Sequence, residues 1–120
     1  MIIDYAITLP WPDRKLSPNA RLHWAVRAKK SREQRAASFV KTKEVMGGFK
    51  PIIKGKVALK VEFYPPDKRR RDGDNVNASL KSAYDGIADA LGVDDNLFII
   101  NYEMKEQILN EVVVFISFEI

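Results

Sequence analysis

Residues 56–64 read KVALKVEFY and carry the clearest strand pattern in the chain. Apolar side chains recur there at every second position, namely Val57, Leu59, Val61 and Phe63. Successive side chains of a strand point to opposite faces of a sheet, so this alternation predicts a strand with one buried face. The prolines that follow the strand end it, because proline has no N–H to donate to a neighbouring strand. A sheet with one buried face needs a second layer of secondary structure to cover that face.

Helices are expected on either side of this strand. Helix-forming residues dominate from about 22 to 46, after a Ser17-Pro18-Asn19 entry, and Gly47-Gly48 ends the segment. A second helix is expected over about 75–91, where apolar residues fall on one side and Gly92 is a suitable C-cap. The first helix has few apolar residues for its length, which predicts a narrow core-facing stripe and a wide basic face.

Three further strands complete the pattern. Residues 2–9 form a largely apolar run closed by prolines, and residues 98–105 and 112–118 flank a short turn. The resulting order β-α-β-α-β-β predicts an α+β fold, in which helices pack on a small mixed sheet. With 120 residues, the chain is expected to form a single domain over residues 1–120.

Composition restricts the chemistry that the chain can support. Cysteine is absent and His23 is the one histidine, so thiolate and multi-histidine metal sites are excluded. A metal ion would have to be held by carboxylates, which favours Mg²⁺ or Mn²⁺. No apolar run is long enough to span a bilayer, and the N-terminal residues lack the basic leader of a signal peptide. We therefore expect no membrane association, and a place in the bacterial cytoplasm or, for a viral gene, in that of the host cell.

Positive charge is concentrated in two parts of the chain. The net charge is +4, but residues 13–50 hold eleven lysines and arginines against three acidic residues. A second cluster is Lys68–Arg71. Clustered cations favour a polyanionic partner because they release counterions from phosphates, although the first cluster could also be a solvated helix face. The candidates for phosphate contacts are Arg21, Arg27, Lys29, Lys30, Arg69, Arg70 and Arg71.

Two acidic turns flank the second predicted helix. Asp72 and Asp74 precede it, separated by a glycine that lets the backbone bend, and Asp94-Asp95 follows it. If the first turn is extended, Asp72 and Asp74 project to the same side. The sequence leaves open whether the chain folds back to bring Asp94-Asp95 near them. If it does, the converging carboxylates would need a divalent cation, usually Mg²⁺, to offset their repulsion.

Each acidic turn also has a purely structural interpretation. Residues 72–75 could be a polar turn that caps a helix, with Asp74 or Asn75 as the N-cap, and residues 94–96 could be a solvated turn. An EF-hand calcium loop is excluded, because Ala83 stands where the closing glutamate is required. Taken singly, neither turn distinguishes a structural role from metal binding.

A longer pattern surrounds these turns. Its parts are spread over most of the chain. In order, they are ITLPWP (7–12), SPNAR (17–21), PPDKRRRDGDN (65–75), Lys81, Asp85 and LGVDD (91–95). In this order and spacing the chain resembles the RusA family of Holliday junction resolvases. The resemblance implies a homodimer that binds four-way DNA junctions, depends on Mg²⁺, with Mn²⁺ as a substitute, and nicks two opposing strands symmetrically to leave 5′-phosphate ends.

The resemblance also implies roles for individual residues. Asp72, Asp74 and Asp95 would be the catalytic, metal-binding carboxylates, with Asp94 as the second choice to Asp95. Arg71 matches the basic residue that precedes the first aspartate of the family pattern.

Lys81 matches the helix lysine of that family, although some relatives place the lysine closer to the second aspartate. Seven residues along a helix return to nearly the same face, so Lys81 can still point toward the carboxylates and contact the scissile phosphate. The alternative is a surface ion pair with Asp85, four residues later.

Two other functions stay open beside junction resolution in recombination, repair or phage DNA processing. One is a nuclease that cuts flaps or branched DNA without preferring four-way junctions. The other is a non-catalytic DNA-binding module in which the carboxylates only cap turns. The first keeps the metal site, whereas the second predicts DNA binding that survives EDTA.

Overall fold

The computed structural model describes residues 1–120, and its sheet has four strands. These are β1 (Ile2–Pro10), β2 (Lys54–Tyr64), β3 (Phe98–Met104) and β4 (Glu111–Glu119), in the order β1-β4-β2-β3. Strand β2 runs parallel to β3 and antiparallel to β4, and β1 runs antiparallel to β4. The sheet is therefore mixed, and the four predicted strands are confirmed with bounds shifted by at most two residues.

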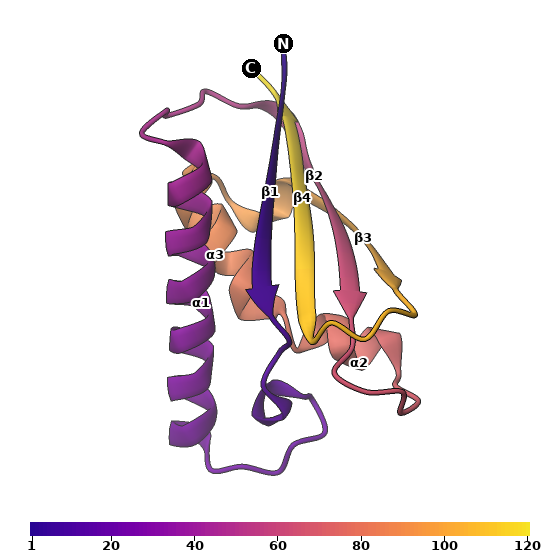
Figure 1. Cartoon of the computed structure of the whole chain (residues 1–120). Coiled ribbons are helices and arrows are strands. Elements are labelled where there is room, and N and C mark those ends of the chain that lie inside the picture. The colour runs from indigo at the N-terminus through magenta and orange to yellow at the C-terminus, as the bar shows by residue number, and fades with distance from the viewer.

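Three helices pack on one face of this sheet. They are α1 (Trp24–Met46), α2 (Gly73–Ala78) and α3 (Lys81–Leu91). Figure 1 shows α1 standing beside the sheet next to α3, with α2 near the end of β2 and β3. The predicted α+β fold, with helices on a small mixed sheet, is confirmed.

The core lies between the sheet and α3. The four apolar residues of β2 that alternate in the sequence are all buried, as predicted. The residues that pack with them come mainly from β4 and α3, namely Val112, Val114, Ile116, Ala83, Ile87 and Ala90. The other face of the sheet carries no helix, and Phe115 and Ile99 are exposed on it.

Helix α1 begins later than the Ser17-Pro18-Asn19 entry that the sequence suggested. Its N-cap is His23, whose Nδ1 accepts a hydrogen bond from the backbone N–H of Ala25 at 3.2 Å. Its end is as predicted, because Gly47 adopts a φ of 59°, which glycine adopts without strain. No helix of the fold is both long and apolar enough to cross a bilayer.

The predicted helix over 75–91 is two helices, separated at Ser79 and Leu80. The side chain of Gln34, on α1, fills the break. Its Nε2 donates to the carbonyl of Ser79 at 3.0 Å, and its Oε1 accepts from the N–H of Ala83 at 3.1 Å. These are the two groups that a continuous helix would join to each other, so the inserted amide replaces that helical bond.

Replacing Gln34 with leucine is expected to lower the free energy of unfolding by roughly 1–3 kcal/mol, because the Ser79 carbonyl loses the Gln34 donor. The Ala83 N–H keeps only its bond to the Leu80 carbonyl, at 3.0 Å. Gln34→Glu puts a carboxylate oxygen against the Ser79 carbonyl oxygen in a half-buried place, so its loss should be at least as large. Urea denaturation measures both changes. A loss below about 0.5 kcal/mol for Gln34→Leu would contradict the bridging role.

Candidate functional site

The first acidic turn begins α2. Asp72 is the N-cap, and its Oδ1 accepts from the backbone N–H of Asp74 at 2.9 Å. The predicted capping role therefore falls to Asp72 and not to Asp74 or Asn75. The capping bonds use one oxygen of Asp72, and both Asp72 and Asp74 are exposed to solvent.

Tyr102 of β3 holds this turn in place. Its hydroxyl donates a hydrogen bond to the carboxylate of Asp74. A Cβ added to Gly73 would lie 3.2 Å from the ring of Tyr102, so the turn sits directly on the ring. The same ring packs edge-on against Phe63 of β2, with centroids 6.0 Å apart. A buried strand thus fixes the position of Asp74 through one aromatic side chain.

The hydrogen bond to Asp74 also raises the pKa of Tyr102, with burial and the charges of Asp74 and Asp72 adding to the effect. The hydroxyl therefore stays protonated, and remains a donor, across the neutral range. Sequence reasoning missed Tyr102. Its place in the inward-facing series of β3 was the available signal, but its partner lies 28 residues away in the chain.

The second acidic turn folds back onto the start of α3. Lys81 Nζ lies 3.1 Å from an oxygen of Asp95 and 2.8 Å from one of Asp85. The amine of Lys81 lowers the pKa of Asp95, and Asp85 is the main cause of the raised pKa of Lys81. Asp94 caps the short 3₁₀ turn Asp95–Leu97 by accepting from the N–H of Asn96 at 2.9 Å.

The structure keeps the two acidic turns as separate groups. Asp74 faces Tyr102, whereas Asp95 faces Lys81, which also forms the alternative ion pair with Asp85. No three acidic or histidine side chains lie close enough together to hold a metal ion. The carboxylates are the right type of donor for Mg²⁺, but their arrangement does not fit a three-carboxylate metal site. The metal-ligand assignment of Asp72, Asp74 and Asp95 stays a prediction.

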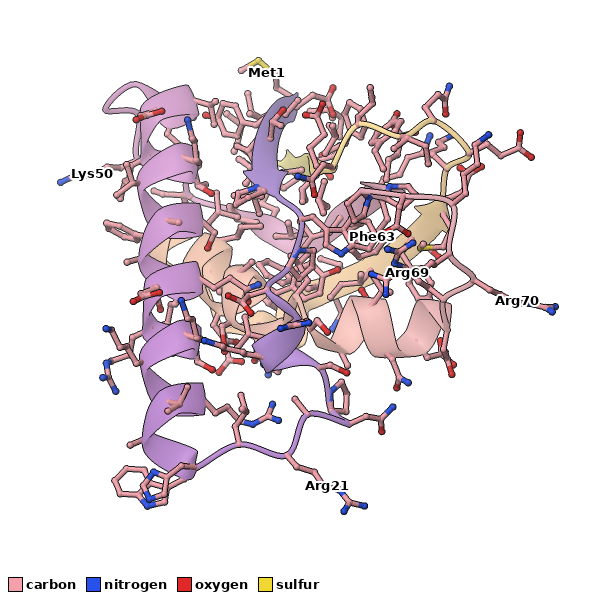
Figure 2. The ribbon with its side chains drawn as sticks, turned by 60° about the horizontal axis from the view of Figure 1, so that its bottom comes forward. Met1, Arg21, Lys50, Phe63, Arg69 and Arg70 are labelled. Atoms are coloured by element: carbon pink, nitrogen blue, oxygen red, sulfur yellow. The ribbon has the colours of Figure 1, made fainter.

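The basic loop before Asp72 is shaped by Asp67. Arg71 Nη2 lies 2.7 Å from Asp67 Oδ1, and the side chain of Arg71 is only 15% exposed. Arg69 pairs with the same carboxylate at 3.2 Å but is 81% exposed. Arg70 projects into solvent, away from the domain (Figure 2). Of the three predicted phosphate contacts, Arg69 and Arg70 are free to reach a ligand, whereas Arg71 mainly closes the loop.

Asp67 is expected to titrate near pH 2, because the N–H of Arg69 and the guanidinium of Arg71 lower its pKa from 3.8 to about 2. Since the folded pKa is the lower one, the contribution of this carboxylate to stability is complete above 3.8 and is lost as the pH falls toward 2. Carboxyl-carbon NMR measures the midpoint. In Arg71→Ala the midpoint should rise part of the way, and an unchanged midpoint would contradict the pairing.

The basic residues near the start of α1 divide into two kinds. Arg27 Nη2 donates to the carbonyls of Ser17 and Ala20, at 3.0 and 2.8 Å, and so holds the preceding loop. Lys30 lies 3.7 Å from Asp13 and 3.4 Å from Glu33. Arg21 and Lys29 form no ion pair and are exposed, and Arg21 points away from the domain in Figure 2. Of the four predicted phosphate contacts in this region, Arg21 and Lys29 are therefore the two that are free.

The fold and the two acidic turns define an α+β domain with exposed carboxylates and exposed cations on neighbouring loops. Models of known protein families give no match to the chain. An uncharacterised protein of Xylella fastidiosa is 38% identical over 104 residues, which cover 86% of this chain and 68% of that protein. The chain belongs to the same family as that protein.

A weaker likeness links the chain to a solved structure. The structure of IspF from Plasmodium falciparum, in complex with CDP, matches with a TM-score of 0.40 and 10% sequence identity. The match covers 98% of this chain and 92% of that one. A likeness at this level carries no argument about the site.

Proposed function

We propose that this protein is a structure-selective endodeoxyribonuclease of the RusA type, which resolves four-way DNA junctions in the cytoplasm with Mg²⁺ as its cofactor. The exposed pair Asp72 and Asp74 would hold the Mg²⁺ together with water and a DNA phosphate, so three converging carboxylates are not required. The observation that carries the proposal is the exposed pair Asp72 and Asp74, fixed by Tyr102 and placed directly after a loop with exposed arginines.

The exposed arginines supply the binding part of the proposal. Arg69 and Arg70 would neutralise the phosphates of the strand that lies beside Asp72 and Asp74. Arg21 and Lys29 would contact phosphates farther along the DNA, since Arg21 lies in the loop before α1 and Lys29 near the start of that helix. Arg71 acts indirectly, because its bond to Asp67 sets the shape of the loop.

The second acidic turn supplies a further charged group. Lys81 is 63% exposed and lies between Asp85 and Asp95, so it can exchange one carboxylate partner for a DNA phosphate. Resolution of a four-way junction requires two nicks, and a homodimer with two-fold symmetry would provide two such sites.

The direct test uses three labelled substrates of matched sequence: a four-way junction, a flap and a linear duplex. With Mg²⁺ or Mn²⁺ we expect paired nicks in opposing strands of the junction, with 5′-phosphate ends, and with EDTA we expect none. Equal rates on flap and junction would favour the nuclease without junction preference. Binding of the junction without cleavage in either metal would favour the non-catalytic module, and would refute the proposal.

A further inference from the structure

A crevice of about 410 Å³ opens beside the first acidic turn. Three segments that are distant in the sequence form it: the chain after β1, the loop after β2, and α2. The residues that line it and carry the argument are Trp11, Arg14, Ser17, Arg69, Arg71 and Asn75. Three of its lining residues are arginines and none is acidic, so the crevice is a positively charged hollow.

One of the three arginines has no internal partner, and the other two share a single carboxylate. Arg14 is exposed and forms no ion pair. Arg69 has one carboxylate partner, Asp67, which it shares with Arg71. An arginine without a carboxylate partner, in a hollow without acidic residues, favours an anion.

The inner wall of the crevice is rigid. The guanidinium of Arg71 lies 5.4 Å from the ring of Trp11, and that ring packs edge-on against Phe63 of β2 at 5.9 Å. The guanidinium is fixed in turn by hydrogen bonds to the carbonyls of Asp67 and Arg69, at 3.1 and 2.9 Å. A wall held in this way costs little to order when a ligand binds.

We propose that this crevice binds a phosphate group of a DNA strand, one that neighbours the phosphate beside Asp72 and Asp74. Asn75 connects the two places, because it lines the crevice and follows Asp74 in the first turn of α2. Arg14 and Arg69 would hold the phosphate oxygens, and the Ser17 hydroxyl and the Asn75 amide are neutral donors at the same hollow. This assignment rests on the proposed function, since it makes DNA the source of the phosphate.

Trp11 provides the measurement. The chain has two tryptophans, so Trp24→Phe leaves Trp11 as the single reporter, and Trp24 is 75% exposed at the start of α1. In EDTA, thymidine 3′,5′-bisphosphate should give a saturable change in Trp11 fluorescence. Arg14→Ala and Arg69→Ala should each weaken binding about tenfold, through loss of one charge-assisted contact.

Lys60→Ala is the matched control, because this exposed lysine lies on the uncovered face of the sheet. It removes one positive charge and should leave the affinity unchanged. Circular dichroism checks that each variant is folded. Equal weakening by Lys60→Ala, or equal binding of thymidine without phosphate, would overturn the assignment. Inorganic phosphate that binds as tightly as the bisphosphate would also overturn it, since a free anion would then be the ligand.

Measurements of Trp11 fluorescence and of junction cleavage distinguish a failure of the phosphate site from a failure of the proposed nuclease activity. If Trp11 responds and Arg14→Ala weakens binding while no junction is cut, the proposed nuclease fails and the phosphate site stands. If the junction is cut at the normal rate by Arg14→Ala and Trp11 gives no response, the crevice assignment fails alone.

Discussion

Replacement of Gly86 by alanine is expected to destabilise the fold by about 3 kcal/mol, which would lower the melting temperature by roughly 10 °C. Gly86 lies in α3 where α1 crosses it, and an added Cβ would overlap the Oγ of Ser38 and the carbonyl oxygen of Arg35. Ser38 is fully buried and its hydroxyl donates to the carbonyl of Ala83 at 2.7 Å, so it cannot move aside. The two helices would have to separate.

Close packing and helix propensity predict opposite changes in stability for Gly86→Ala. Helix propensity alone predicts that alanine stabilises an α-helix by roughly 0.5–1 kcal/mol relative to glycine. Gly92→Ala is the control, because its φ of 73° strains alanine but nothing lies within 4 Å of the added Cβ. That variant should lose about 1 kcal/mol. Thermal or urea unfolding compares the two, and a Gly86→Ala protein as stable as wild type would contradict the close packing of α1 on α3.

Asp74→Asn is expected to reduce junction nicking at least about 100-fold, because the neutral amide removes a negative charge from the reaction site. The amide keeps an oxygen that can accept from Tyr102, so the turn should stay folded. Single-turnover nicking of a synthetic junction in Mg²⁺ measures the loss. A gel-shift assay in EDTA should show that the affinity for the junction is retained or increased.

Asp4→Asn gives the matched control. Asp4 is exposed and lies on the uncovered face of β1, so its neutralisation changes the net charge equally and leaves the first acidic turn intact. Its nicking rate should equal that of wild type. If Asp74→Asn nicks junctions within about threefold of wild type, Asp74 has no part in the reaction.

Local patterns in the sequence were sufficient to predict most of the fold. The alternation from Val57 to Phe63 gave the central strand, and the glycines at positions 47 and 92 gave the two helix ends. The break at Ser79 could not be predicted in this way. It depends on Gln34, which is 45 residues away and reaches the break only after α1 has packed on α3.

Less of the site than of the fold could be predicted, because the site also depends on contacts between residues that are distant in the sequence. The acidic turns could be recognised because Asp72, Asp74 and Asp95 are grouped in the sequence. Their neighbours in space could not, since Tyr102 reaches Asp74 from β3. The roles of Arg27 and Arg71 as loop-holding residues were also hidden, because an arginine that binds backbone carbonyls has the same sequence signature as one that binds phosphate.

The bridge formed by Gln34 has a consequence for how charge is positioned. One amide joins the middle of α1 to the first turn of α3, where Lys81 lies. A slide of α1 along its own axis would break both hydrogen bonds at once, so the backbone of α1 and the backbone at Lys81 keep a constant separation. A DNA strand that contacts the start of α1 and the start of α3 would therefore meet two helices held at a fixed spacing.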